Sequence, residues 1–194
     1  YVSLEVSPRL AHDTGGTIDE ARRFWKVLDR PNVMIKVPAT EEGLPAITAL
    51  LAEGVNVNVT LLFARDMYER VARAYLDGVR RYAEAGGPAR RVASVASFFV
   101  SRIDSAVDGE IAAMADNDNG DGGQPPYDLM GRVAIANARL AYQSYLNIFS
   151  GDRWRRLAAG GARPQRLLWA STSTKNPAYS EVLYVEELIG ADTV

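Results

Sequence analysis

The chain has 194 residues, of which 47 % are hydrophobic, and its 22 basic and 24 acidic side chains leave a net charge of −2. These values indicate one globular domain with a sizeable core, and the balance of charge argues against a general nucleic-acid or membrane-surface binder. Without cysteine and with a single histidine, His12, the sequence excludes disulfides, zinc–thiolate sites and multi-histidine metal sites. No apolar run approaches the roughly 20 residues that a membrane helix needs.

Five stretches with strand-like patterns alternate with longer stretches that have helical spacing of apolar residues. The predicted strands cover residues 1–6, 32–38, 55–62, 91–99 and 165–171. The predicted helices cover residues 17–28, 41–53, 65–85, 103–115, 128–149, 153–159 and 177–189. Thr17 is expected to cap the first helix, with Glu20 completing a capping box. Because the sequence begins inside a strand and stops just after a helix, with nothing to close the fold, we expect an internal segment of a longer protein.

The region between residues 103 and 160 departs from the simple alternation. It holds more than one predicted helix and, at residues 116–126, the run D-N-D-N-G-D-G-G-Q-P-P, which is typical of a mobile loop. The acidic spacing loosely resembles a calcium loop, but the terminal glutamate and the flanking pattern of such a loop are absent. We therefore expect residues 1–194 to form a single domain with extra helices and a loop between its fourth and fifth strands.

The alternation of strands and helices predicts a parallel sheet with crossover helices. Three strands carry one strongly polar face; in residues 55–62, for example, Leu61 is expected on the apolar face with Val55, Val57 and Val59. An open sheet would bury such polar faces against helices, whereas a closed barrel lets them meet inside. No glycine-rich phosphate loop follows any strand. We therefore predict an α/β fold that forms five consecutive βα units of a (β/α)8 TIM barrel.

Lys36 lies in the middle of a strand whose other residues are mostly apolar. In the run N-V-M-I-K-V-P-A-T, Val33, Ile35 and Val37 point one way, and Met34 and Lys36 point the other. An isolated charge costs several kcal/mol to bury, so such a lysine normally reaches water, finds a partner or loses its proton. Two interpretations follow: a neutral amine kept for covalent chemistry, or an edge-strand lysine that faces water and discourages aggregation.

On a barrel, several polar side chains converge with Lys36 at the inner face and at the carboxyl ends of the strands, where active sites of this fold form. They are Glu5, Lys36, Asn58, Thr60, Ser97 and Arg102. We expect Glu5 to be a buried carboxylate near a buried lysine, and such a pair is either a structural ion pair or an acid/base group beside an amine nucleophile. The hydroxyl and amide groups alongside favour the catalytic interpretation, because perturbed groups cluster at functional sites.

The motifs on all five predicted strands together resemble one known family, the transaldolases. They read V-S-L-E-V-S, M-I-K-V-P-A-T, N-V-N-V-T-L-L-F, A-S-F-F-V-S-R-I-D and W-A-S-T-S-T-K-N-P. The trailing S-T-S-T-K-N-P-A-Y is similar to the longer bacterial transaldolases. The resemblance spans essentially the whole chain and implies strands 3 to 7 of a class I aldolase-like barrel without a metal or other cofactor.

The resemblance implies a cytoplasmic enzyme of the non-oxidative pentose phosphate pathway whose partners are sugar phosphates. Such an enzyme moves a dihydroxyacetone unit from sedoheptulose 7-phosphate or fructose 6-phosphate to an aldose phosphate. Lys36 matches the Schiff-base lysine, and Glu5 and Thr60 match the pair that positions a catalytic water. Asn58 matches the amide that binds hydroxyls of the dihydroxyacetone unit.

The phosphate-binding residues match the family less closely. Ser97 and Arg102 match a phosphate-binding pair, although Arg102 is equally readable as an ordinary surface arginine in the first turn of a helix. Where many members have A-S-F-R on the last of these strands, this chain has A-S-T-S-T-K, so Lys175 is a candidate replacement for the arginine and Ser171 a candidate contributor.

Parts of the family's active site fall outside this sequence. Its acid/base aspartate and an active-site asparagine lie on the first two strands of the barrel, and the eighth strand is also absent. We therefore expect activity from the parent chain and not from this segment alone. Two alternatives remain: a Schiff-base aldolase that releases free dihydroxyacetone, and a non-catalytic sugar-phosphate-binding barrel.

Overall fold

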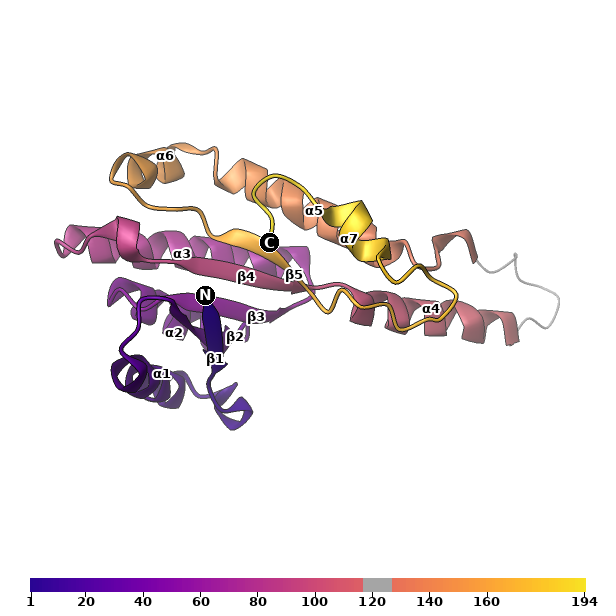
Figure 1. Ribbon diagram of the computed structural model, residues 1–194, viewed down its shortest axis with the longest axis horizontal. Helices are drawn as coiled ribbons and strands as arrows, with labels where there is room; N and C mark the ends of the chain where they lie inside the picture. The colour runs from indigo at the N-terminus through magenta and orange to yellow at the C-terminus, as the bar shows by residue number, and fades with distance from the viewer. Residues whose placement is uncertain (117–126) are drawn as a thin grey trace.

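A computed structural model describes residues 1–116 and 127–194, and its centre is a parallel sheet in which every strand pairs with its neighbours in the sequence (Figure 1). The predicted loop at residues 116–126 falls almost entirely outside the described residues. The strands are β1 (Val2–Glu5), β2 (Val33–Pro38), β3 (Val57–Leu62), β4 (Ser94–Phe99) and β5 (Arg166–Ala170). All five predicted strands are confirmed, with slightly shorter bounds.

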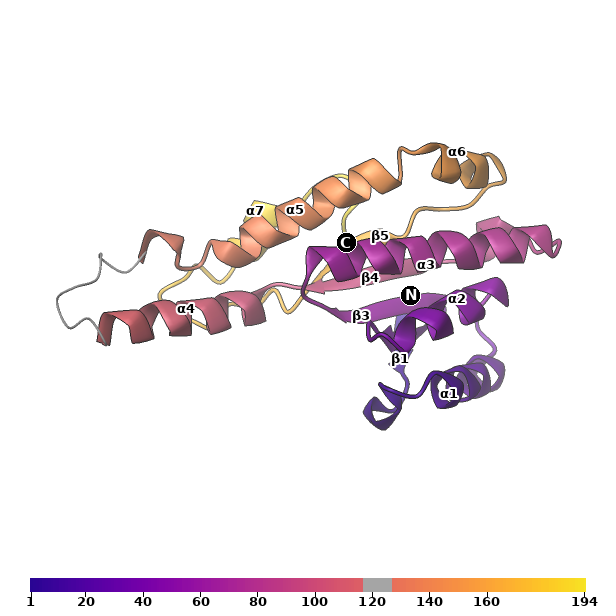
Figure 2. The ribbon, with the colours of Figure 1, turned by 180° about the vertical axis from the view of Figure 1, so that it is seen from behind.

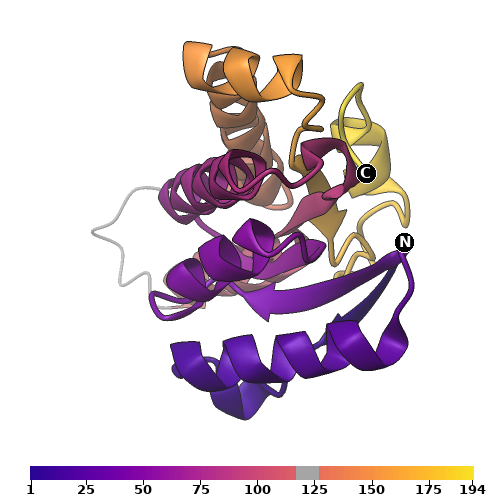
Figure 3. The same ribbon diagram turned by 90° about the vertical axis from the view of Figure 1, so that its left-hand side faces the viewer.

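The helices α1, α2 and α3 lie along one side of the sheet, as the end-on view shows (Figure 3), whereas α4 runs beyond the carboxyl ends of the strands (Figure 1). Seen from behind, α2, α3 and α5 cover the strands (Figure 2). The α-helices are α1 (Thr14–Leu28), α2 (Gly43–Ala52), α3 (Arg65–Glu84), α4 (Ser101–Asp116), α5 (Val133–Ile148), α6 (Asp152–Ala159) and α7 (Leu183–Leu188). Short 3₁₀ turns are η1 (Pro8–Leu10), η2 (Ala89–Arg91) and η3 (Tyr127–Leu129).

The strand order β1-β2-β3-β4-β5 confirms the fold class, because each crossover advances the sheet in one direction, as in a barrel. The chain is thus a partial (β/α) barrel. Thr193 forms a parallel bridge with Leu167, and the Val194 N–H donates to the Leu167 carbonyl at 2.9 Å, so the chain end pairs with the outer edge of β5.

The main core lies between the sheet and its helical layer, where apolar strand residues such as Ile35, Val37 and Val59 are fully buried. A second, smaller cluster of Met34, Ala93 and Val95 lies on the opposite face. Strand parity therefore separates a large outer core from an inner face that carries both a small apolar layer and polar side chains.

The start of α1 corrects the predicted capping box. The N-cap is Asp13, whose carboxylate accepts from the Gly16 N–H at 2.9 Å. Thr17 lies inside the helix and donates to the Leu10 carbonyl, while Glu20 accepts from the Ser7 N–H. Aspartate is a stronger cap than threonine, and its use adds almost one turn to the helix.

Two later helices are shorter than their apolar spacing predicted. The predicted helix at residues 177–189 is replaced by an irregular segment and α7 alone, because the side chains of Asn176 and Ser180 accept backbone N–H groups that a helix would use. The predicted helix at residues 128–149 begins only with α5, after Gly131 turns the chain with a φ of 70°.

The alternation of β3 breaks at Leu61, which corrects its predicted place in the core. Leu61 has a φ of 60° and the strand register shifts between Val59 and Leu62. Leu61 is 42 % exposed as a result, and Leu62 takes the core position at 0 % exposure. The bulge lies directly after Thr60, at the carboxyl end of the strand, where bulges commonly re-aim side chains.

We predict that Leu62→Ala lowers the free energy of unfolding of the full-length protein by about 2–5 kcal/mol, because it empties a buried leucine site. Leu61→Ala is the matched control, with the same chemistry one residue away, and should change the stability by less than about 1 kcal/mol. Urea unfolding followed by circular dichroism measures both. Equal losses from the two variants would contradict the observed bulge.

Candidate active site

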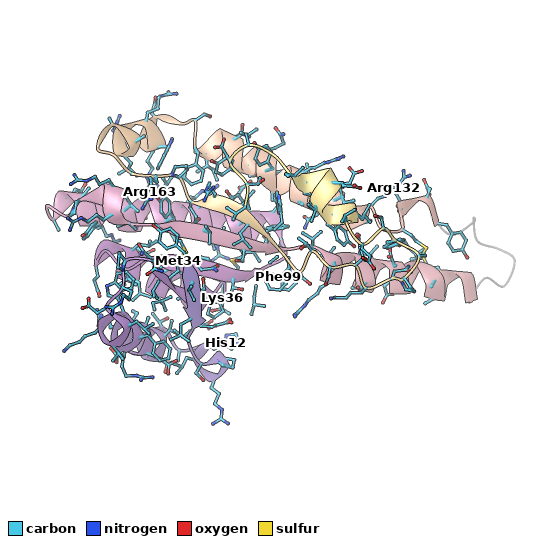
Figure 4. The ribbon with its side chains drawn as sticks, in the orientation of Figure 1. His12, Met34, Lys36, Phe99, Arg132 and Arg163 are labelled. Atoms are coloured by element: carbon cyan, nitrogen blue, oxygen red, sulfur yellow. The ribbon has the colours of Figure 1, made fainter. Side chains whose placement is uncertain are left out.

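Lys36 lies on an interior strand, so the edge-strand interpretation of this lysine was wrong. β2 pairs with β1 on one side and with β3 on the other, and Glu5, Lys36 and Asn58 are register partners across the three strands. Lys36 Nζ lies 3.4 Å from Glu5 Oε2, and the two side chains are 27 % and 45 % exposed. Figure 4 labels Lys36 on β2 together with Phe99 at the end of β4.

The local sequence explains why this amine faces inward. Val33, Ile35 and Val37 enter the outer core, so the period of two in a strand forces Lys36 onto the opposite face. Glu5 was expected to be a buried carboxylate, but it is about half exposed because β1 forms one edge of the sheet. A carboxylate in contact with water loses little of its hydration and needs no buried partner.

A hydrogen-bonded chain of side chains crosses the inner face beside Lys36. The Ser97 hydroxyl donates to Asn58 Oδ1 at 2.7 Å, and Asn58 Nδ2 donates to Ser3 Oγ at 3.0 Å. Asn58 and Ser97 are buried, and these contacts fix the orientation of the amide. Ser3 was not among the candidate residues of the sequence analysis. It lies two residues before Glu5 on the first strand, and this spacing predicts that both side chains share the inner face.

Thr60 follows Asn58 on the same face of β3 and is register partner of Pro38 at the end of β2. Its side chain is 0 % exposed, and its hydroxyl has no hydrogen-bond partner among the protein atoms that the structure describes. An unsatisfied buried hydroxyl costs about 1–3 kcal/mol, which a bound ligand or water offsets. Thr60 is therefore suited to hold a small polar molecule close to the strand carrying Lys36.

Arg102 lies in the first turn of α4, directly after β4, and it is exposed. Its guanidinium lies over the ring of Phe99, 5.2 Å from the centroid, and Phe99 packs against Phe63 with 5.1 Å between the ring centroids. The stacking holds the guanidinium at the carboxyl end of the sheet. Its N–H donors make no hydrogen bond to the described residues and can bind an anion. The Ser97 hydroxyl donates to Asn58 Oδ1, and no hydrogen bond joins it to Arg102 among the described residues.

Ser171 and Lys175 belong to the irregular segment that follows β5. Ser171 Oγ lies 2.9 Å from Ser101 Oγ, and the Ser101 N–H donates to the Ser171 carbonyl at 3.1 Å, so the segment begins next to Arg102. Lys175 is exposed, and its ammonium donates to Ser173 Oγ at 2.8 Å. Arg102 and Lys175 thus offer two cations from neighbouring segments at the carboxyl ends of β4 and β5.

Within residues 1–116 and 127–194, no group of three or more His, Asp or Glu side chains is placed to hold a metal ion. In the same part of the chain, no helix combines the length and the apolar character that crossing a membrane requires. The inner face instead offers an amine, a carboxylate, hydroxyls and an amide. This set of groups is suited to covalent carbonyl chemistry on a polyhydroxylated substrate.

The whole chain, residues 1–194, matches the family model described as Transaldolase/Fructose-6-phosphate aldolase. Among curated relatives, a protein named Transaldolase from Parafrankia sp. (strain EAN1pec) is 57 % identical over 194 residues, which are 100 % of this chain and 50 % of the relative. Transaldolases from Saccharopolyspora erythraea and Trichodesmium erythraeum are 54 % and 52 % identical, with 100 % of this chain and 50 % and 51 % of those proteins covered.

The chain spans about half the length of the curated relatives it matches. The motifs that carry the resemblance lie on the strands that form the inner face, and the family match extends over every one of those strands. The chain therefore belongs to the transaldolase/fructose-6-phosphate aldolase family.

Proposed function

We propose that this chain supplies the imine-forming part of a transaldolase, with Lys36 as the nucleophile. The observation that carries the proposal is the amine of Lys36 on an interior strand, 3.4 Å from Glu5 and in register with Asn58. A lysine in a central strand has no structural advantage over an apolar residue, so its presence there needs a chemical reason. Family membership supports that reason, because Glu5, Lys36 and Thr60 stand in the motifs that carry the resemblance.

The chemistry follows from an amine facing a ketose carbonyl. The unprotonated Lys36 amine attacks the carbonyl carbon, and loss of water from the carbinolamine leaves a protonated imine. Cleavage of the C–C bond between the carbons α and β to the imine sends its electron pair into the imine. The hydroxyl on the β carbon loses its proton and becomes the carbonyl of the released aldose, which leaves an enamine on Lys36. The enamine carbon attacks the carbonyl of an aldose acceptor, and water then hydrolyses the new imine to restore the amine.

Glu5 and Thr60 are proposed to position the water that moves protons during imine formation and hydrolysis. Glu5 lies beside the amine and in contact with solvent, while the buried Thr60 hydroxyl has no protein partner among the described residues. A water between them would satisfy the hydroxyl and give the carboxylate a proton carrier. The exposure of Glu5 lets that carrier exchange with bulk water.

The remaining residues are proposed to bind the substrate. Asn58, held by Ser97 and Ser3, would meet hydroxyls of the dihydroxyacetone unit. Arg102 would bind the phosphate with its fork of N–H donors, and Ser171 and Lys175 would add a hydroxyl and a point charge from the next segment.

The proposed donor is sedoheptulose 7-phosphate or fructose 6-phosphate, and the proposed acceptor is an aldose phosphate, as in the non-oxidative pentose phosphate pathway. Cleavage of the C–C bond also needs a group that takes the proton from a substrate hydroxyl. The family places that acid/base aspartate on a strand that this sequence does not contain. We therefore propose the complete turnover for the parent chain and not for this segment alone.

A Schiff-base aldolase that releases free dihydroxyacetone is the second candidate, because the matching family model covers both transaldolases and fructose-6-phosphate aldolases. The two activities share the imine and differ in the fate of the enamine. Transfer needs an aldose acceptor, whereas release needs only a proton and water. Product assays with and without an aldose phosphate therefore separate them.

We predict that borohydride reduction of the full-length protein with fructose 6-phosphate traps a covalent adduct on Lys36, identified by peptide mass spectrometry. Lys36→Arg should abolish trapping and lower kcat by at least about 10⁴-fold, because it keeps a positive charge beside Glu5 but removes the nucleophile. Lys26→Ala, on the exposed side of α1, is the control and should trap normally. Trapping that survives Lys36→Arg would disprove the assignment, and a wild type that never traps would favour the non-catalytic binding barrel.

We predict that Thr60→Val lowers the rate of imine formation by about 10²-fold, the lower end of what a positioned proton-transfer group contributes. Valine matches threonine in shape, and the hydroxyl has no described protein partner, so the stability of the fold should be unchanged or slightly higher. Single-turnover trapping measures the rate. Thr60→Ser keeps the hydroxyl and should stay within about tenfold of the wild type; equal losses from both variants would contradict the role of the hydroxyl.

A further inference from the structure

Asp104 is a buried carboxylate on α4 that joins two distant parts of the chain. Its Oδ1 accepts from the Ala134 N–H at 2.7 Å, at the start of α5, and its Oδ2 accepts from the Tyr184 hydroxyl at 2.8 Å, on α7. Burial raises the pKa of Asp104, while the two hydrogen bonds oppose that shift. A carboxylate in such surroundings is expensive to keep unless every contact is made, so its partners are held in fixed positions.

Asp108 repeats the same arrangement one turn along the helix. Its Oδ1 accepts from the Gly131 N–H at 3.0 Å, and its Oδ2 accepts from the Tyr179 hydroxyl at 2.6 Å. Burial and the bond to Asp108 raise the pKa of Tyr179 to about 12, which keeps its proton in place as the donor. Residues four apart on a helix share a face, so both carboxylates meet the same neighbouring segment.

The acidic pair is not arranged as a cation site. All four oxygens of Asp104 and Asp108 already accept a hydrogen bond from a backbone N–H or a tyrosine hydroxyl. Those donors point their protons at the oxygens, which is the opposite of what a metal requires. The two carboxylates therefore attach the segment that carries Tyr179 and Tyr184 to α4.

That segment is residues 171–184, which runs beside α4 before it reaches α7 (Figures 1 and 2). One end is fixed by the contact of Ser171 with Ser101, at the start of α4. The other end is fixed by Tyr179 and Tyr184 on the two carboxylates. Lys175 lies between these fixed ends and borders a cavity of about 310 Å³ that Asp104, Asp108 and both tyrosines also line.

We propose that Asp104, Asp108, Tyr179 and Tyr184 form a carboxylate–tyrosine clamp. Together with the contact of Ser171 with Ser101, the clamp holds the segment that carries Lys175 against α4, so that Lys175 can bind the phosphate group of the substrate with Arg102 and Ser171. Arg102 and both carboxylates belong to the same helix, so α4 acts as the common frame for the two sides of the phosphate site. The clamp residues are positioning residues and do not touch the substrate. This inference rests on the proposed function, in which Ser171 and Lys175 bind phosphate.

The test uses Tyr179→Phe and Tyr184→Phe in the full-length protein, each of which removes one hydroxyl from the clamp and keeps the ring. The KM for fructose 6-phosphate should rise about tenfold, the equivalent of one lost hydrogen bond to a charged group. The KM for unphosphorylated fructose, the kcat and the trapping at Lys36 should change by less than about twofold.

Tyr75→Phe is the matched control, because the Tyr75 hydroxyl donates to the Arg163 carbonyl, before the amino end of β5 and away from the proposed site. It should reduce thermal stability without altering the ratio of the two KM values. Equal rises in KM for phosphorylated and unphosphorylated sugar, or the same ratio change in Tyr75→Phe, would overturn the positioning role.

Hydrogen exchange tests the clamp independently of the reaction. Amide exchange over residues 171–184 should become at least about tenfold faster in Tyr179→Phe and stay unchanged in Tyr75→Phe. Unchanged exchange in Tyr179→Phe would overturn the clamp even in a fully active enzyme. If the wild type fails to trap any ketose, the proposed function fails, and faster exchange would then support attachment of the segment but overturn its assigned role in phosphate binding.

Discussion

The period of two along β2 is the constraint on which the site depends. Because Val33, Ile35 and Val37 pack in the outer core, the side chain of Lys36 must lie on the opposite, inner face of the sheet. An amine on the inner face of an interior strand needs polar neighbours, and the register supplies Glu5 on one side and Asn58 on the other. The packing of the outer core therefore helps to set the geometry of the inner face.

Much of the fold could be predicted from the sequence because the signals for it are local. All five strands, the crossover helices and the parity of Glu5, Lys36 and Asn58 follow from hydrophobic patterns alone. The pattern failed at Leu61, where apolar residues at two successive positions, 61 and 62, give no sign of which one enters the core. The position of a bulge depends on tertiary structure, in this case on how the carboxyl end of β3 pairs with β4.

The candidate site was predictable in part, for a related physical reason. Glu5 and Lys36 stand out as charges in strands, and the structure pairs them. Asp104 and Asp108 did not stand out, because carboxylates four apart on a helix usually form a solvated face. Their burial depends on tyrosines more than 70 residues away, which no local pattern connects to them. The burial and role of a residue cannot be predicted from a single sequence when they depend on partners far away in the chain.

An unsatisfied buried hydroxyl is not by itself a mark of function in this protein. Tyr68 and Gln165 each have a buried oxygen without a hydrogen-bond partner among the described residues, yet Tyr68 is on a covering helix and Gln165 precedes the amino end of β5. Thr60 differs by position: it shares the inner face with Asn58, lies at the carboxyl end of β3 and directly precedes the bulge. The bulge interrupts the regular hydrogen-bond ladder between β3 and β4 directly after Thr60. Thr60 therefore lies at the carboxyl end of the inner face, where ligands bind in barrels of this kind. Register, more than burial, therefore singles out Thr60 as the hydroxyl that we propose to act with Lys36.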